Sequence, residues 1–197
     1  MKKIVLASII AAAFVATPVL AQGYVGLGVG SSSASGIDQT SGAVSLTSSN
    51  NSRTSVKIFG GFKFTPNWGL EAQYADLGNR DFVIRNGAAQ VGSGNVKLSQ
   101  FSLAGTGTLP LASNFSVFGK LGASNNSGKV NAAVPVAGVT FNDSGNKTDL
   151  MVGVGLTYAI TPQIAVRAEY EDFGKFNNDG GNSVRVNNFS VGLQYSF

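Results

Sequence analysis

The side chains that carry most enzyme and metal chemistry are scarce in this 197-residue chain. It has no histidine, the commonest acid–base catalyst and metal ligand, and no cysteine. Charged residues make up only 12% of the chain, against about 25% in an average soluble domain. The chain therefore predicts no catalytic set, no metal site and no cofactor. The chemistry left to it belongs to a small group of charges: Glu71, Lys120, Arg167 and Glu169.

The spacing of these charges predicts that they meet inside the protein. Glu71 and Arg167 each lie five residues past a turn proline, Pro66 and Pro162, which places both about 15 Å along an extended strand. Because a buried charge is costly unless it is paired, we expect an internal salt-bridge network of alternating sign. A carboxylate pair formed by Glu169 and Glu171 is the enzymatic alternative, and nothing else in the sequence indicates a sugar cleft.

The elements that must position these charges are predicted to be strands. Three short proline-containing connectors, FTPNW (64–68), LPLASNF (109–115) and ITPQI (160–164), each join two runs of alternating apolar residues. Reading outward from them gives eight strands, at residues 24–31, 55–65, 68–77, within 96–109, 115–123, 149–160, 163–173 and 183–197. Long polar segments, including 78–95 and 124–147, link the other ends. Short turns on one side and long loops on the other predict an all-β, eight-stranded antiparallel transmembrane β-barrel, with periplasmic turns and extracellular loops.

The composition of the two strand faces indicates which face is outside. The polar face carries Gly, Ser, Ala, Thr and Gln rather than the many Lys and Glu of a soluble surface. Small side chains suit the interior of an eight-stranded barrel, which is barely wide enough to be filled by side chains. The apolar face has aromatic residues near the strand ends, as at the interfaces of a bilayer: Trp68, Tyr74, Phe115, Tyr158, Tyr170, Tyr195 and Phe197. We therefore expect the apolar face to contact lipid.

The first 21 residues are predicted to be a signal peptide. Lys2 and Lys3 precede an apolar run at residues 4–15, then Pro18 and the small residue Ala21. The run is too short for a transmembrane helix, which needs about 20 apolar residues. We expect cleavage after Ala21, so that residues 22–197 form a single barrel domain.

The last strand, FSVGLQYSF (189–197), alternates up to a terminal phenylalanine. A closed barrel requires this, because an unpaired edge strand in lipid leaves backbone groups unsatisfied. This terminus, together with WGLEAQYADLG (68–78), IAVRAEYEDFG (164–174) and GKLGAS (119–124), resembles the small bacterial outer-membrane barrels of the outer-membrane protein A and opacity type. The resemblance implies that Leu193, Tyr195 and Phe197 form the signal read by the barrel-assembly machinery. It extends to the barrel only, since no peptidoglycan-binding domain is expected after it.

The resemblance also implies the function. A structural and surface-interacting role in the outer membrane of a Gram-negative bacterium is the leading interpretation, with lipid, lipopolysaccharide and the assembly machinery as partners and host or matrix adhesion through the loops. The alternative is a narrow pore for small solutes or ions, gated by Glu71, Lys120, Arg167 and Glu169, because related small barrels are thought to open when such pairs exchange partners. An enzyme and a soluble ligand-binding barrel are the weaker readings. No basic cluster indicates nucleic acid, although the net charge is +4.

Overall fold

The computed structural model describes residues 22–35, 39–41, 44–48, 52–87, 89–134, 139–177 and 183–197. The predicted signal peptide lies outside the described residues. Within them, no helix is long and apolar enough to cross a membrane. The elements are strands: β1 (Gln22–Ser35), β2 (Gln39–Ser41), β3 (Val44–Ser48), β4 (Ser52–Lys63), β5 (Trp68–Asn86), β6 (Ala89–Pro110), β7 (Phe115–Val134), β8 (Val139–Ala159), β9 (Ile164–Asn177) and β10 (Ser183–Ser196).

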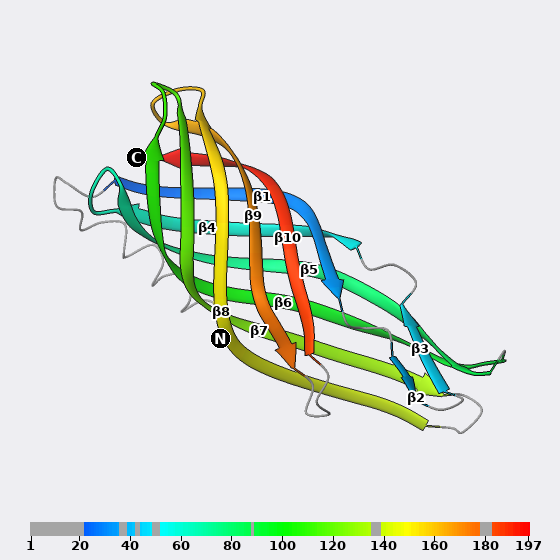
Figure 1. Cartoon of the computed structure of the whole chain (residues 1–197). Helices are drawn as coiled ribbons and strands as arrows, with labels where there is room; N and C mark the ends of the chain where they lie inside the picture. The colour runs from blue at the N-terminus through cyan, green and yellow to red at the C-terminus, as the bar shows by residue number, and fades with distance from the viewer. Residues whose placement is uncertain are drawn as a thin grey trace, which may run out of the picture.

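Eight of these strands close into one antiparallel barrel (Figure 1), which confirms the predicted fold. The closure is made between the first and last strands, where β1 and β10 pair from Tyr24 opposite Ser196 to Ser35 opposite Arg185. On its other side β1 pairs with β4, and β5 pairs with both β4 and β6. Every barrel strand therefore has two partners, as a barrel in lipid requires.

The three short connectors form tight turns at one end of the barrel, the short-turn end. Two of them share a Thr-Pro sequence with the same hydrogen bond. Trp68 N–H donates to Thr65 Oγ1 at 2.9 Å, and Ile164 N–H donates to Thr161 Oγ1 at 2.9 Å. The proline that follows each threonine has no N–H to leave unpaired in the turn. The sequence repeat thus corresponds to a repeat in turn chemistry.

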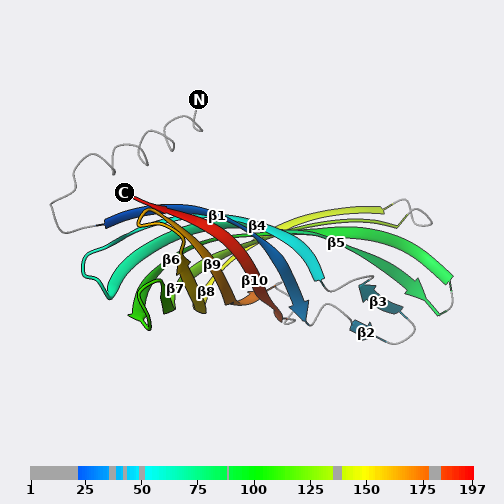
Figure 2. The same cartoon turned by 90° about the horizontal axis from the view of Figure 1, so that it is seen from above.

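At the opposite end the strands run further than predicted. Segments 78–95 and 124–147, expected to be loops, are mostly strand, since β5 continues to Asn86 and β7 to Val134. β3 adds to the edge of β5, with Val44 opposite Asn86. Figure 2 shows β5 continuing past the ends of β1 and β10. Apolar residues do not alternate regularly along this extension, as the consecutive Phe82, Val83 and Ile84 show, so the pattern that reveals a strand at a lipid boundary is absent there.

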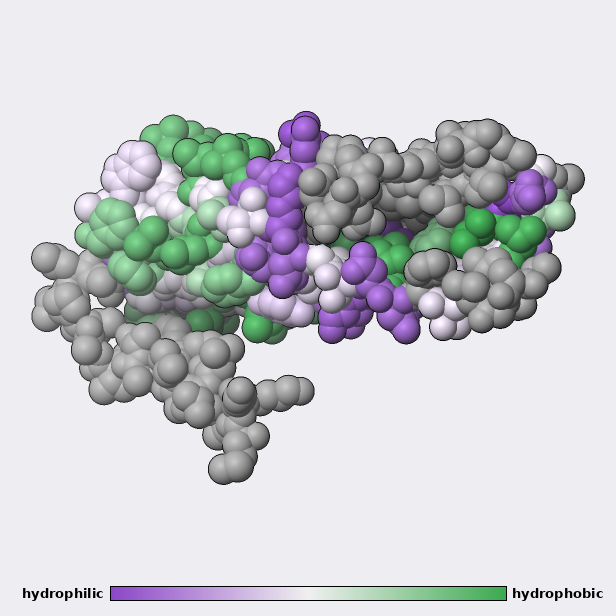
Figure 3. Space-filling model, turned by 90° about the horizontal axis from the view of Figure 1, so that it is seen from below, coloured by the Kyte–Doolittle hydropathy of each residue, from purple (hydrophilic) through white to green (hydrophobic). Residues whose placement is uncertain are grey.

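The barrel is apolar outside and polar inside. Leu27, Trp68 and Val154 are each about 60% exposed, whereas Lys120, Glu171 and the other inward charges are almost fully buried. Figure 3 shows hydrophobic residues over much of one end of the visible face, next to a band of hydrophilic residues, with smaller hydrophobic patches beyond that band. This arrangement reverses that of a soluble protein and confirms that the apolar face is outside.

Candidate functional site

Glu71 is the centre of an ion-pair network that crosses the lumen. Its carboxylate receives two hydrogen bonds from Arg167, at 2.6 Å from Nη1 and 3.1 Å from Nη2. Lys120 Nζ donates to it at 3.0 Å. Tyr24 OH donates to the same carboxylate at 2.9 Å. These residues come from β1, β5, β7 and β9, so a single carboxylate joins opposite walls of the barrel.

Lys120 is bound to three carboxylates. Its Nζ lies 3.0 Å from Glu71, 2.7 Å from Glu169 and 2.5 Å from Glu171. Arg167 Nη2 completes a further pair with Glu169 at 3.1 Å. The structure therefore brings together all four predicted residues, Glu71, Lys120, Arg167 and Glu169, and adds Glu171 to them.

Sequence reasoning missed Lys57. Its ammonium group forms ion pairs with Glu169 and, at 3.0 Å, with Glu171. The alternation of the sequence could have identified Lys57, because Val56 and Ile58 point outward and the residue between them must point inward. With Lys57 included, the charged layer contains three cations and three carboxylates, all at most 4% exposed: Lys57, Glu71, Lys120, Arg167, Glu169 and Glu171.

Two phenylalanines hold the Arg167 guanidinium in place. Its carbon lies 4.6 Å from the ring centre of Phe59 and 4.1 Å from that of Phe118, which are cation–π distances. Glycines make room for these rings. A Cβ at Gly26 would lie 2.2 Å from Phe59, and one at Gly155 would lie 2.3 Å from Phe118. Arg167 is thus oriented by packing as well as by its carboxylates.

An apolar layer fills the lumen further from the short turns. Six barrel strands contribute its buried members: Ala34, Ala75, Leu77, Leu98, Met151, Phe173 and Val186.

Leu77 and Phe173 occupy equivalent places in the repeated sequences ADLG and EDFG. In each repeat the aspartate accepts the glycine N–H at 2.9 Å, and the glycine has a positive φ, +83° at Gly78 and +74° at Gly174. The bend interrupts the regular strand pairing next to the buried side chain.

Beyond this layer lies a buried cation that sequence reasoning also missed. Arg80 is 1% exposed and donates to Ser32 Oγ at 2.8 Å and to the Leu77 carbonyl at 3.3 Å. Its inward direction follows from the bend at Gly78, which reverses the alternation of β5.

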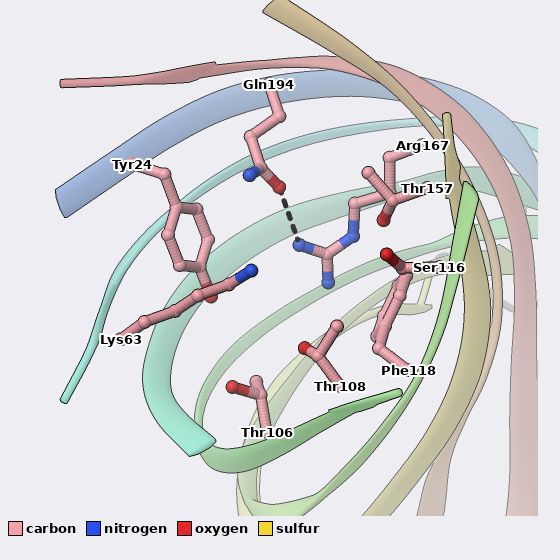
Figure 4. Close-up of a pocket in the computed structure, with 9 residues that line it drawn as sticks. All are labelled: Tyr24, Lys63, Thr106, Thr108, Ser116, Phe118, Thr157, Arg167 and Gln194. Atoms are coloured by element: carbon pink, nitrogen blue, oxygen red, sulfur yellow. Dashed lines mark hydrogen bonds between the residues drawn. The ribbon is translucent and has the colours of Figure 1, made fainter. Parts of the chain in front are cut away.

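At the short-turn end, the charged layer borders a small polar cavity of about 50 Å³. Figure 4 shows Arg167 and Lys63 directed into it from different strands. Gln194 Oε1 accepts a hydrogen bond from Arg167 Nη1 at 3.4 Å on the wall of this cavity. Arg167 thus links the cavity to the charged layer.

The chain matches the outer membrane protein beta-barrel domain family over residues 4–197. It belongs to this family. The curated relatives include outer membrane protein A of Shigella flexneri, which is 28% identical over 141 residues. That match covers 71% of this chain and 39% of the relative, so the chain spans well under half of the curated protein.

Solved structures of outer-membrane barrels share the fold. OprG from Pseudomonas aeruginosa is 16% identical, with a TM-score of 0.60 over 90% of this chain and 95% of that one. Neisserial surface protein A is 19% identical, with a TM-score of 0.58 over 89% and 97%. Ail of Yersinia pestis, solved in complex with the heparin analogue sucrose octasulfate, is 18% identical, with a TM-score of 0.52 over 89% and 99%.

In the structure of this outer-membrane barrel, the two carboxylates of the enzymatic alternative, Glu169 and Glu171, are both engaged in ion pairs. Glu169 contacts Lys57, Lys120 and Arg167, and Glu171 contacts the two lysines. Both side chains are at most 2% exposed, and their oxygens are engaged by cations of neighbouring strands. The site is suited to binding the strands to one another.

Proposed function

We propose that this protein is a structural outer-membrane barrel with a closed lumen, which displays extended β-hairpins outside the cell and turns its short connectors to the periplasm. The neutral charged layer carries this proposal. Three cations and three carboxylates satisfy each other across the lumen. Opening a path through them would leave charges unpaired in a narrow interior, which is strongly unfavourable.

The apolar layer is a second obstruction in series with the first. Its side chains Leu77, Met151 and Phe173 have no measurable exposure. A hydrated ion would have to lose water on contact with these side chains. Two obstructions of different chemistry support a permanently closed barrel more strongly than either would alone.

Export and assembly complete the proposal. We infer that residues 1–21 direct secretion and are cleaved after Ala21. Leu193 and Tyr195 on β10, and Phe197 directly after it, are all about half exposed on the lipid-facing side, where another protein can contact them. The rings of Tyr195 and Phe197 lie 6.5 Å apart. An exposed aromatic pair at the end of the closing strand supports recognition by the barrel-assembly machinery.

The surface-interaction part of the proposal concerns the extension beyond the barrel. Continuous pairing of β7 with β8, from Phe115 opposite Tyr158 to Val134 opposite Val139, makes the extended β7–β8 hairpin a stiff presentation surface. Ail was solved with a heparin analogue, so sulfated polysaccharide is the first surface ligand to test here. Cells displaying the protein should bind immobilised heparin, and deletion of residues 127–146 should abolish binding while the barrel remains heat-modifiable on SDS gels. Equal retention by the deletion variant would refute adhesion through this hairpin.

Conductance in planar bilayers tests the closed lumen. The wild-type protein, purified in folded form and verified by its heat-modifiable mobility, should add no discrete current steps across a range of voltages. An intact barrel that conducts steadily would overturn the proposal.

A gated pore is the second candidate, and the three carboxylate partners of Lys120 favour it. Because Glu71, Glu169 and Glu171 all lie within 3.0 Å of the Lys120 ammonium group, Lys120 can lose one partner and keep others. A gate would give brief openings in the wild-type protein, and charge reversal in Lys120→Glu would change their frequency. Openings that are unchanged in this variant would exclude gating by this network.

A further inference from the structure

The cavity at the short-turn end is rich in hydrogen-bond donors and has no acidic residue among the described residues that line it. Lys63 and Arg167 supply positive charge (Figure 4). Hydroxyl groups come from three adjacent strands: Thr106 and Thr108 on β6, Ser116 on β7, and Thr157 on β8. A cavity with this lining favours a negatively charged occupant.

The charge of Lys63 distinguishes this cavity from the layer beside it. Inside the charged layer every cation has carboxylate partners, and the three positive and three negative charges cancel. Lys63 is half-buried at the end of β4, and no ion pair joins it to any residue in the described part of the chain. Its charge is therefore in excess of the balanced network. A partly desolvated cation of this kind is stabilised by an anion.

Register explains why the hydroxyl groups gather. Ser116 on β7 is directly opposite Thr157 on β8, and Thr157 is directly opposite Arg167 on β9. Thr108 on β6 is paired with Phe118 on β7, one inward position from Ser116. The hydroxyls thus form a connected wall that ends at the guanidinium of Arg167.

We propose that this cavity binds a small inorganic oxyanion of the phosphate or sulfate class. The volume of about 50 Å³ suits a compact tetrahedral group. Lys63 provides the charge, the threonine and serine hydroxyls donate to the oxyanion oxygens, and the guanidinium of Arg167 adds positive potential on the cavity wall. Hydrogen bonds from charged donors to an oxyanion are short and strong. On the proposed orientation the site opens to the periplasm, but binding itself depends only on the cavity.

Titration of the mature protein in detergent micelles tests this inference. Inorganic phosphate and sulfate are added separately at constant ionic strength, with chloride as the balancing anion, while binding is followed by calorimetry and by backbone amide NMR. We expect saturable binding, with shifts concentrated at Thr106, Thr108, Ser116 and Thr157. Absence of saturable binding, or shifts confined to the hairpins at the far end, would overturn the proposal. Equal competition by chloride would overturn the oxyanion assignment.

Lys63→Gln is the decisive variant, and Lys129→Gln is its matched control, because Lys129 is an exposed lysine on the distant part of β7. Loss of a charged hydrogen bond should weaken binding by roughly tenfold or more in Lys63→Gln, and the control should bind as the wild type does. Thr157→Val should weaken binding by a smaller factor while keeping the charge. Heat-modifiable mobility verifies folding of each variant. A folded Lys63→Gln variant that binds phosphate or sulfate with wild-type affinity would refute the site. Because the assay contains no membrane, a negative result here leaves the closed-lumen proposal to be judged by conductance.

Discussion

The two layers inside the barrel occupy neighbouring positions on the same strands but use opposite chemistry. On β5 the inward series passes from Glu71 in the charged layer to Leu77 in the apolar layer, and on β9 it passes from Arg167 to Phe173. The charged layer is held by directional contacts of 2.5–3.1 Å together with the Lys57–Glu169 ion pair. The apolar layer is held by packing, at positions where β5 and β9 bend.

The same lumen is therefore sealed in two ways that differ in their tolerance to substitution. Loss of one partner from an ion-pair network exposes the remaining charges to a poorly solvating interior. Loss of a methyl group from an apolar layer leaves a cavity whose penalty depends on how far the neighbours relax. Substitutions in the charged layer should therefore be the more damaging.

The largest effect is expected from Lys120→Met. Removing this ammonium leaves Glu71, Glu169 and Glu171 to share fewer cations, and should lower the free energy of unfolding by roughly 3–5 kcal/mol. Denaturant titration in lipid vesicles measures it, with the fluorescence of the single tryptophan, lipid-facing Trp68, as the signal. Lys129→Met, at an exposed site on the same strand, is the control. A loss no greater than that of the control would show that the network does not stabilise the barrel.

A smaller loss is expected from Leu77→Ala in the apolar layer. The cavity created should lower the free energy of unfolding by roughly 2–5 kcal/mol, the usual range for a buried leucine. The matched control is Leu103→Ala, a lipid-facing leucine that is 56% exposed. Equal losses in the two variants would contradict the assignment of Leu77 to a packed interior, and a loss exceeding that of Lys120→Met would reverse the order of the two layers.

The bends themselves should be sensitive to glycine replacement. Gly174 has a left-handed backbone conformation, which costs about 1–2 kcal/mol for a residue that has a Cβ. In Gly174→Ala the new Cβ would also lie 2.8 Å from the Asp149 side chain. Gly105→Ala is the control, since the nearest atom to a Cβ there is 3.8 Å away and no positive φ is involved. The same denaturant titration compares the two. If Gly174→Ala left the free energy of unfolding unchanged, the bend would not be required to direct Phe173 inward.

The smallest effect is expected outside the lumen. Lys97 and Asp76 form a pair at 3.3 Å on the outer surface, with side chains 51% and 41% exposed. Because solvent screens such a pair, Lys97→Ala should change the free energy of unfolding by less than about 1 kcal/mol and the effect should shrink further in high salt. A loss as large as that of Lys120→Met would show that burial is not what separates strong pairs from weak ones in this barrel.

Much of the fold could be predicted because the lipid boundary imposes a strict pattern. Alternation along the sequence is enough to locate all eight barrel strands and to place Glu71, Lys120, Arg167 and Glu169 on the inward face. The same pattern fails beyond the barrel, where β5 to β8 continue without regular alternation of apolar and polar residues. There the hydrogen bonding of neighbouring strands, which sequence periodicity does not report, determines where each strand ends.

Along the regular parts of the strands, the amino-acid sequence was enough to predict which side chains face inward, because successive residues of a strand alternate between lipid and lumen. Which of these side chains contact one another depends on the closed barrel. Lys57 joins Glu169 and Glu171 although more than a hundred residues separate them, and Lys63 is left without a carboxylate in the described part of the chain. The stagger between neighbouring strands sets the height of each inward residue. That stagger is a property of the closed sheet rather than of any one strand, so it cannot be predicted from the sequence of a single strand.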